Sequence, residues 1–175
     1  METEQDRTGD LAVDLANTLR PGPGGATADR LADPDGLAGW LRATGGPEDA
    51  GAPELHALRG HVRALLAAAV AGRRLPRAAV TAVNKAAAAA PSVVQLEAGA
   101  LVVRANASPT DAFLAEIAAA AIALVGGPGR DRLRHCDAPG CGRWFVASRP
   151  RQTWCSPTCG NRARLARFHH RHRVA

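Results

Sequence analysis

The sequence predicts an α+β protein: a mostly helical N-terminal domain with a small β-hairpin, followed by a small four-cysteine zinc-binding module that ends in a basic helix. Three observations support this. Apolar residues recur at helical spacing over much of residues 33–126, two β-branched runs flank a glycine-containing turn near residue 99, and all four cysteines lie near the C-terminus.

Charge divides the chain near residue 128. Residues 1–129 carry 11 Lys and Arg against 14 Asp and Glu, whereas residues 130–175 carry 11 Arg against 2 Asp. We predict a disordered N-terminus at 1–9, an α+β domain at 10–127 and a zinc module at 128–175, joined by the glycine-rich linker 126–129. A segment this basic favours a polyanionic partner, with nucleic-acid phosphate as the default.

The first element is predicted to be a strand. Leu11, Val13 and Leu15 alternate with smaller or polar residues, which is the period of a short strand. Asp14 and Asn17 lie on or just after it and are candidate ligand-binding residues, although Asp and Asn at a strand end also cap helices or form turns. Residues 20–30 follow as a Gly- and Pro-rich loop without the ending of a phosphate-binding loop.

Four helices and a hairpin are expected next. Asp33 before Pro34 predicts a helix that stops at Gly45, and Ser108 before Pro109 predicts one that runs to Val125. Residues 53–71 carry one apolar stripe, and residues 76–90 are helical by propensity. Between residue 90 and Ser108, 93–97 and 100–104 are β-branched runs around Ala98-Gly99, a hairpin signal.

The cysteines form two close pairs in the pattern C-x4-C-x13-C-x3-C: Cys136 with Cys141, and Cys155 with Cys159. Two short loops that each present two thiolates fit one tetrahedral Zn²⁺. Two disulfides, an iron–sulfur cluster or free thiols are the alternatives. The polar, acidic N-terminus shows no signal peptide, so a cytoplasmic protein without disulfides is expected. Four thiolates leave no open position, which makes the single zinc structural rather than catalytic.

A basic helix should follow the last cysteine pair. Leu165 and Phe168 share one face and are expected to pack on the zinc core, beside a stripe of arginines. The candidate nucleic-acid-binding residues are Arg162, Arg164, Arg167 and Arg171 of this helix and Arg149 and Arg151 of the preceding loop. An acidic protein, a membrane surface or plain solubility are alternative reasons for this charge. Trp144 and Trp154 could pack against the site or stack on bases.

The stretch Cys159-Gly160-Asn161-Arg162, together with Trp-Phe-Val at 144–146 and Trp-Cys-Ser at 154–156, resembles the CGNR zinc-finger family. In that family an ABATE-type domain precedes the finger and begins with a motif similar to LAVDLANTL at 11–19. The resemblance covers nearly the whole chain and implies a stress-responsive transcription regulator whose finger binds DNA. The chain departs from the family pattern at Ala147, where Asp is common, and at Gln152-Thr153, where Arg-Arg is common.

The function expected is therefore a zinc-containing, bacterial-type transcription regulator that binds double-stranded DNA. Its N-terminal, ABATE-like domain would sense a small-molecule effector or form a homodimer. We expect no enzymatic activity and no membrane association, since no apolar run reaches the ~18 residues that span a bilayer. A zinc-knuckle adaptor for protein partners, or an enzyme with its site in the N-terminal domain, are the alternatives.

Overall fold

The computed structural model describes residues 10–22 and 26–173, so the predicted disordered N-terminus lies outside the described residues. The helices are α2 (Asp10–Ala16), α3 (Pro34–Thr44), α4 (Ala52–Val70), α5 (Arg77–Ala89), α6 (Pro109–Gly126), the 3-10 helix η2 (Pro128–Arg132) and α7 (Pro157–Arg173). The strands are β1 (Leu19–Pro21), β2 (Thr27–Asp29), β3 (Ser92–Glu97), β4 (Ala100–Ala105), β5 (Leu133–His135) and β6 (Trp144–Val146), paired in sequence as three antiparallel hairpins. The predicted α+β class is confirmed.

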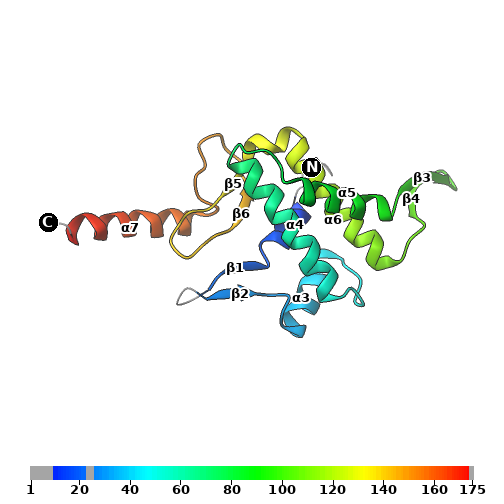
Figure 1. Cartoon of the computed structure of the whole chain (residues 1–175), viewed down its shortest axis with the longest axis horizontal. Helices are drawn as coiled ribbons and strands as arrows, with labels where there is room; N and C mark the ends of the chain where they lie inside the picture. Colours follow the sequence, from blue (N-terminus) through cyan, green and yellow to red (C-terminus); the bar gives the residue numbers. More distant parts are fainter. Residues whose placement is uncertain (1–9, 23–25, 174–175) are drawn as a thin grey trace.

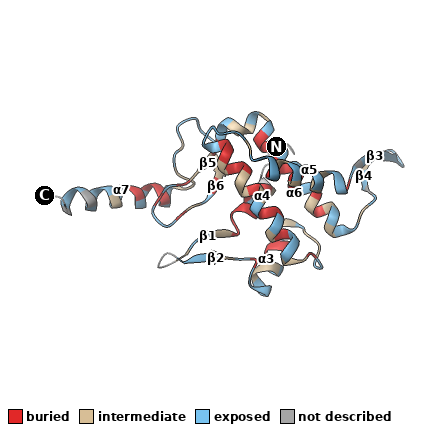
Figure 2. Ribbon diagram, viewed as in Figure 1, coloured by how far each residue is buried: buried red, intermediate tan, exposed pale blue. Residues whose placement is uncertain are grey.

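The helices α2, α4, α5 and α6 gather in the middle of the molecule, whereas α7 and the β3–β4 hairpin project at opposite ends (Figure 1). The buried residues follow this arrangement and concentrate in the central helices (Figure 2). Leu15, Leu55, Leu66 and Ile117 are fully buried there. One hydrophobic core thus organises residues 10–126, and the two projecting elements are left open to solvent.

Helix α6 is the apolar centre of this core. Among the described residues it is the one helix whose length and composition would allow it to cross a membrane, which the count of uninterrupted apolar residues did not predict. Phe113, Ile117 and Leu124 are nevertheless buried against the other helices. This burial is typical of a core helix and does not indicate a membrane span.

The strand predicted at the start of the chain is wrong, because Asp10–Ala16 form helix α2. Ala12 and Ala16 are as completely buried as Leu15. A strand pattern emerges only if the alanines are counted as solvent-facing, whereas they are the small residues that let a short helix approach α4 and α6 closely. The loop predicted at 20–30 is in part the hairpin of β1 and β2.

The predicted helix starts are confirmed by their caps. The Asp33 carboxylate accepts a hydrogen bond from the Gly36 amide at 2.8 Å, and Ser108 accepts one from the Asp111 amide at 3.0 Å. Gly45 ends α3 with a left-handed φ of 73°, which favours glycine. Local sequence signals were reliable wherever a side chain satisfies the first free amides of a helix.

The predicted linker is short and ordered. Gly126 is the last residue of α6, and Pro128–Arg132 turn at once into η2, which packs on α6. Leu133 and Trp144, which come after it, belong to the same hydrophobic core as the N-terminal helices. The base of the cysteine module is therefore packed on the N-terminal domain rather than tethered to it.

The β3–β4 hairpin is confirmed, with Ala98 and Gly99 both at positive φ in its two-residue turn. It extends from the body as an isolated pair of strands (Figure 1). Five large apolar side chains are 56% to 79% exposed on it: Val93, Val94, Leu96, Leu101 and Val103. Its one charge pair joins Arg104 to Glu97 at 2.7 Å.

Candidate metal centre and nucleic-acid interface

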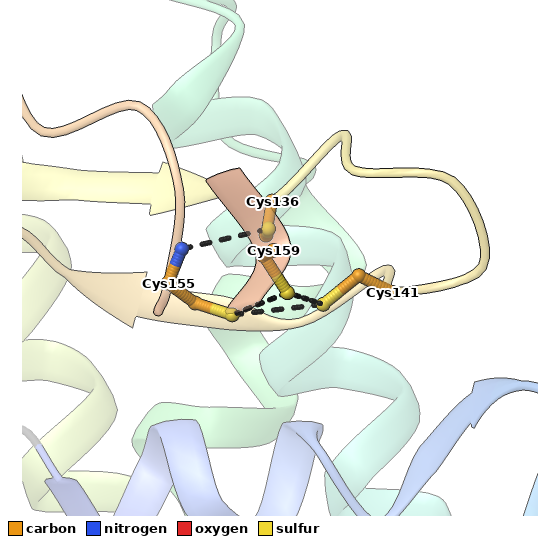
Figure 3. A group of neighbouring side chains, drawn as sticks. All are labelled: Cys136, Cys141, Cys155 and Cys159. Carbon is orange, nitrogen blue, oxygen red and sulfur yellow. Dashed lines mark hydrogen bonds between the residues drawn. The ribbon is translucent and has the colours of Figure 1, made fainter. Parts of the chain in front are cut away.

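Four cysteine sulfurs meet beside the hairpin of β5 and β6 (Figure 3). Cys136 directly follows β5, Cys141 lies in the loop before β6, Cys155 lies just before α7, and Cys159 is in its first turn. The Sγ atoms of Cys141, Cys155 and Cys159 are each 3.6 Å apart, and all four sulfurs lie within 4.8 Å of one another.

This spacing fits zinc. Four sulfurs at about 2.3 Å from a tetrahedral Zn²⁺ lie about 3.8 Å from one another, close to the three observed separations. The same distances exclude the disulfide alternative, since a disulfide needs about 2.05 Å, and all four cysteines are free. The predicted metal ligands Cys136, Cys141, Cys155 and Cys159 therefore form one site for one zinc ion.

Backbone geometry shapes the loop of the first cysteine pair. The Cys136 amide donates to the Arg143 carbonyl at 2.8 Å, and the Gly142 amide returns to the Cys136 carbonyl at 3.2 Å. Gly140 and Gly142 have φ of 71° and 61°, a left-handed backbone conformation that residues with a Cβ rarely adopt. The tight turn lets both sulfurs of this pair join the same cluster.

Each residue of the Cys159–Arg162 motif has a structural role. Gly160 lies under Trp154, because a Cβ there would be 3.1 Å from the indole Cδ1. Arg162 donates to the Cys159 sulfur at 3.2 Å, and Asn161 accepts a hydrogen bond from Arg164. The predicted packing role of the aromatic residues holds for Trp154 against the site and for Trp144, which is buried in the main core.

The thiols differ in acidity. Hydrogen bonds from the Ser156 side chain and from Arg162 lower the pKa of Cys159 to about 6, whereas burial and the neighbouring sulfurs raise the pKa of Cys155 to about 12. Burial also raises the pKa of Cys141. At neutral pH Cys159 is therefore the first thiolate available, and zinc must displace the protons of Cys141 and Cys155, so binding weakens as the pH falls.

The N-terminal domain and the zinc module meet at Asn17. Its amide nitrogen donates to the Trp144 carbonyl at 3.0 Å, and its amide oxygen accepts from the Trp144 N–H at 2.9 Å. Asn17 is buried, and both groups of its amide are engaged, so the ligand-binding prediction gains no support at this residue. Asp14 is exposed on α2 and has an interaction within the chain, and its ligand-binding role stays a prediction.

Replacing Asn17 by alanine should destabilise the chain by roughly 2 to 5 kcal/mol, because it leaves a buried N–H and a buried carbonyl of Trp144 without partners. Zinc content should stay at one equivalent, since no metal ligand changes. Chemical denaturation of the zinc-bound variant measures this, with Asn84→Ala on the exposed side of α5 as the control. A loss no larger than that of the control would show that Asn17 does not hold the two parts together.

Two arginines fix the segment that follows Asn17. Buried Arg59 donates to both carboxylate oxygens of Asp29 at 2.6 Å and to the Thr18 hydroxyl at 2.9 Å. These hydrogen bonds keep the pKa of Asp29 below its usual value. Arg63 donates to the carbonyls of Ala16 and Leu19 at 2.6 and 2.8 Å. Both ends of the β1–β2 hairpin are thereby anchored on α4.

The predicted packing of the apolar strip of α7 on the zinc core is wrong. Leu165 and Phe168 are 60% and 49% exposed, and among the described residues of α7, Ala163 is the last that is buried. Beyond it the helix leaves the body (Figure 1). Phe168 contacts the imidazole of His172, with ring centroids 4.2 Å apart, instead of the cysteine cluster.

The six predicted nucleic-acid-binding arginines line three surface hollows formed by α7 and the cysteine loops. Arg164, Arg167 and Arg171 line one with Leu165 and Phe168. Arg149 and Arg151 line a second together with Arg164, and Arg162 lines a third beside the cysteines.

The departure from the family pattern at Gln152, where Arg is expected, has a structural role. Gln152 accepts hydrogen bonds from Ser148 and donates one to the Trp154 carbonyl.

Comparison with known families agrees with this arrangement. Residues 9–128 match the ABATE family, described as "putative stress-induced transcription regulator", and residues 132–172 match the CGNR zinc finger. A comparison with curated protein sequences gives no match. Because the ABATE match spans more than half of the chain and the four cysteines fall inside the finger, the chain belongs to the ABATE family and carries a CGNR zinc finger.

Proposed function

We propose that the protein is a transcription regulator whose zinc finger presents α7 to double-stranded DNA. The observation that carries this proposal is the free-standing α7. From Arg164 to Arg173 the helix extends about 15 Å beyond Ala163, the last of its described residues that is buried, and it contains no Asp or Glu. A B-DNA major groove is about 12 Å wide and accepts such a helix.

The surface of α7 combines the two kinds of contact that DNA reading requires. Arg164, Arg167 and Arg171 offer guanidinium groups to phosphates and to guanine. Leu165 and Phe168, exposed beside them, are suited to the methyl groups of thymine. An arginine stripe with adjacent exposed apolar side chains supports DNA as the partner better than a role in solubility, which would favour polar neighbours.

In this proposal zinc is a scaffold and the protein is not an enzyme. Four thiolates fill the coordination sphere of the ion, so it has no position for water or substrate. The four cysteines form no disulfide with one another, which also supports a reducing, cytoplasmic location. A small-molecule site at Asp14 and Asn17 forms no part of the proposal, because Asn17 uses its amide on Trp144.

Binding of the zinc-loaded chain to duplex DNA, followed by fluorescence anisotropy between about 50 and 200 mM salt, tests the proposal. Affinity should fall steeply with salt, because phosphate contacts release counterions. Removal of zinc with a chelator should abolish binding, since α7 then loses its anchor at Cys159. Salt-insensitive binding, or none at low salt, would contradict a DNA-binding function.

We further propose that the chain forms a weak homodimer through the β3–β4 hairpin. The register pairs Val94 with Val103 and Leu96 with Leu101, so these four exposed side chains share one face of the hairpin. At roughly 60 to 120 Å² per side chain, the eight side chains of two such faces together bury about 480 to 960 Å², less than the ~1,000 Å² of a stable interface. Self-association should therefore depend on protein concentration.

Replacing both Leu96 and Leu101 by glutamate should abolish this dimer, because like charges then face one another across the contact. Sedimentation equilibrium at increasing concentration measures it, with Gln95→Glu on the other face as the matched control. A wild-type chain that remains monomeric at high concentration, or a double variant that still associates, would rule out the hairpin as the contact surface.

A further inference from the structure

A groove lies between the β1–β2 hairpin and the zinc finger. Residues of three separate segments line it, among them Arg20 and Pro21 of the hairpin, Arg143 of the first cysteine loop, and Ser156, Thr158 and Arg162 around the start of α7. Three of the lining residues are arginines, and none of the described residues that line the groove is Asp or Glu. The groove is therefore a concentrated positive surface beside the metal site.

The two walls of the groove are held in fixed positions. Pro21 of β1 packs directly on Gly142, because a Cβ on that glycine would lie 2.5 Å from the proline Cδ. Arg63 and Arg59 anchor the ends of the hairpin on α4, and Asn17 joins the hairpin's base to β6. The backbone that carries Arg20 is consequently held at a defined place beside the finger.

The three arginines differ in whether their side chains already have a partner within the protein. Arg162 donates to the Cys159 sulfur at 3.2 Å, so it balances negative charge of the thiolate cluster. Arg20 and Arg143 are exposed, and neither forms a hydrogen bond or ion pair through its side chain with another residue in the described ranges 10–22 and 26–173. Two guanidinium groups from separate segments, in a groove that Ser156 and Thr158 also line, form a site suited to an anion with several oxygens.

We infer that this groove of the protein binds a backbone phosphate of the DNA, with Arg20 and Arg143 as the residues that contact the phosphate. Helix α7 occupies the major groove of the same DNA. The inference rests on the proposed DNA binding and extends the contact surface from the finger to the N-terminal domain. Phosphate contacts of this kind fix the orientation of a protein on the duplex and carry no sequence information. The β1–β2 hairpin thus sets how deeply and at what angle α7 enters the major groove of the DNA.

The experiment measures duplex binding of the full zinc-loaded chain for Arg20→Ala and Arg143→Ala, with Lys85→Ala on exposed α5 as the control for loss of one positive charge. Each groove variant should lower the slope of log K against log salt by about 0.9. The loss of affinity should be the same for any duplex sequence. Arg20→Lys should restore most of the slope, because the charge is kept.

A slope that stays equal to that of Lys85→Ala in both variants would overturn the inference while leaving DNA binding by α7 intact. If the wild-type chain does not bind duplex DNA at all, the proposed function falls and this inference falls with it. Arg143 lies in a cysteine loop, so its variant is assayed for zinc content. Arg20 lies outside the finger, and its variant decides the question alone if Arg143→Ala loses metal.

Discussion

Replacing Cys141 by alanine should reduce zinc content well below one equivalent and melt the finger. The ion supplies roughly 10 to 16 kcal/mol of folding free energy in small zinc modules, and the buried cluster around it contains few other apolar residues. Helix α7 should lose most of its helical structure, because Cys159 and Ala163 are its buried anchors. The N-terminal core should survive, since its helices bury most of the large apolar side chains.

Metal analysis and far-ultraviolet circular dichroism of the variant measure both effects. His169→Ala is the matched control, because His169 contacts Phe168 and is not near the sulfurs. The control should keep one equivalent of zinc. A Cys141→Ala protein that retains a full equivalent and a cooperative melt of α7 would show that four thiolates do not hold the ion.

Replacing Arg164, Arg167 and Arg171 together by alanine should weaken duplex binding by roughly 100-fold near 0.1 M salt and lower the salt slope by about 2.7. The helix itself should remain folded, because alanine has the higher helix propensity and the substitutions relieve repulsion between like charges. Zinc content should not change, since none of these arginines touches a sulfur in the described structure.

The matched control removes the same charge elsewhere. Arg74, Arg77 and Lys85, exposed in and before α5, are replaced by alanine in one variant. Its affinity should fall only slightly, through the change in net charge. Equal losses in the two triple variants would mean that overall charge, and not the arginine stripe of α7, determines binding.

Local sequence signals predicted the structure well. The caps at Asp33 and Ser108, the turn at Ala98-Gly99 and the spacing of the cysteines each specify their own geometry, and all are present in the structure. The family resemblance added the pairing of an ABATE domain with a CGNR finger, which the comparisons confirm.

Sequence signals were misleading where contacts between distant parts of the chain determine the local structure. The alternation at 11–15 predicts a strand, but Ala12 and Ala16 are core residues of a helix packed on two sides. The amphipathic pattern of α7 predicts a packed helix, yet the helix leaves the body before Leu165. Asn17 looks like a ligand residue, whereas its partner is a backbone group 127 positions away. No short-range pattern in a single sequence marks these long-range pairings.

Hydrogen exchange of the zinc-bound chain, with and without duplex DNA, is the sharpest test of DNA binding through α7, because it locates the contact surface along the whole chain. We expect slower exchange in residues 157–173, with additional protection at 19–22 and 140–143, and no change in the β3–β4 hairpin. Protection confined to the hairpin or to the central helices, with α7 unchanged, would rule out α7 as the DNA-binding element.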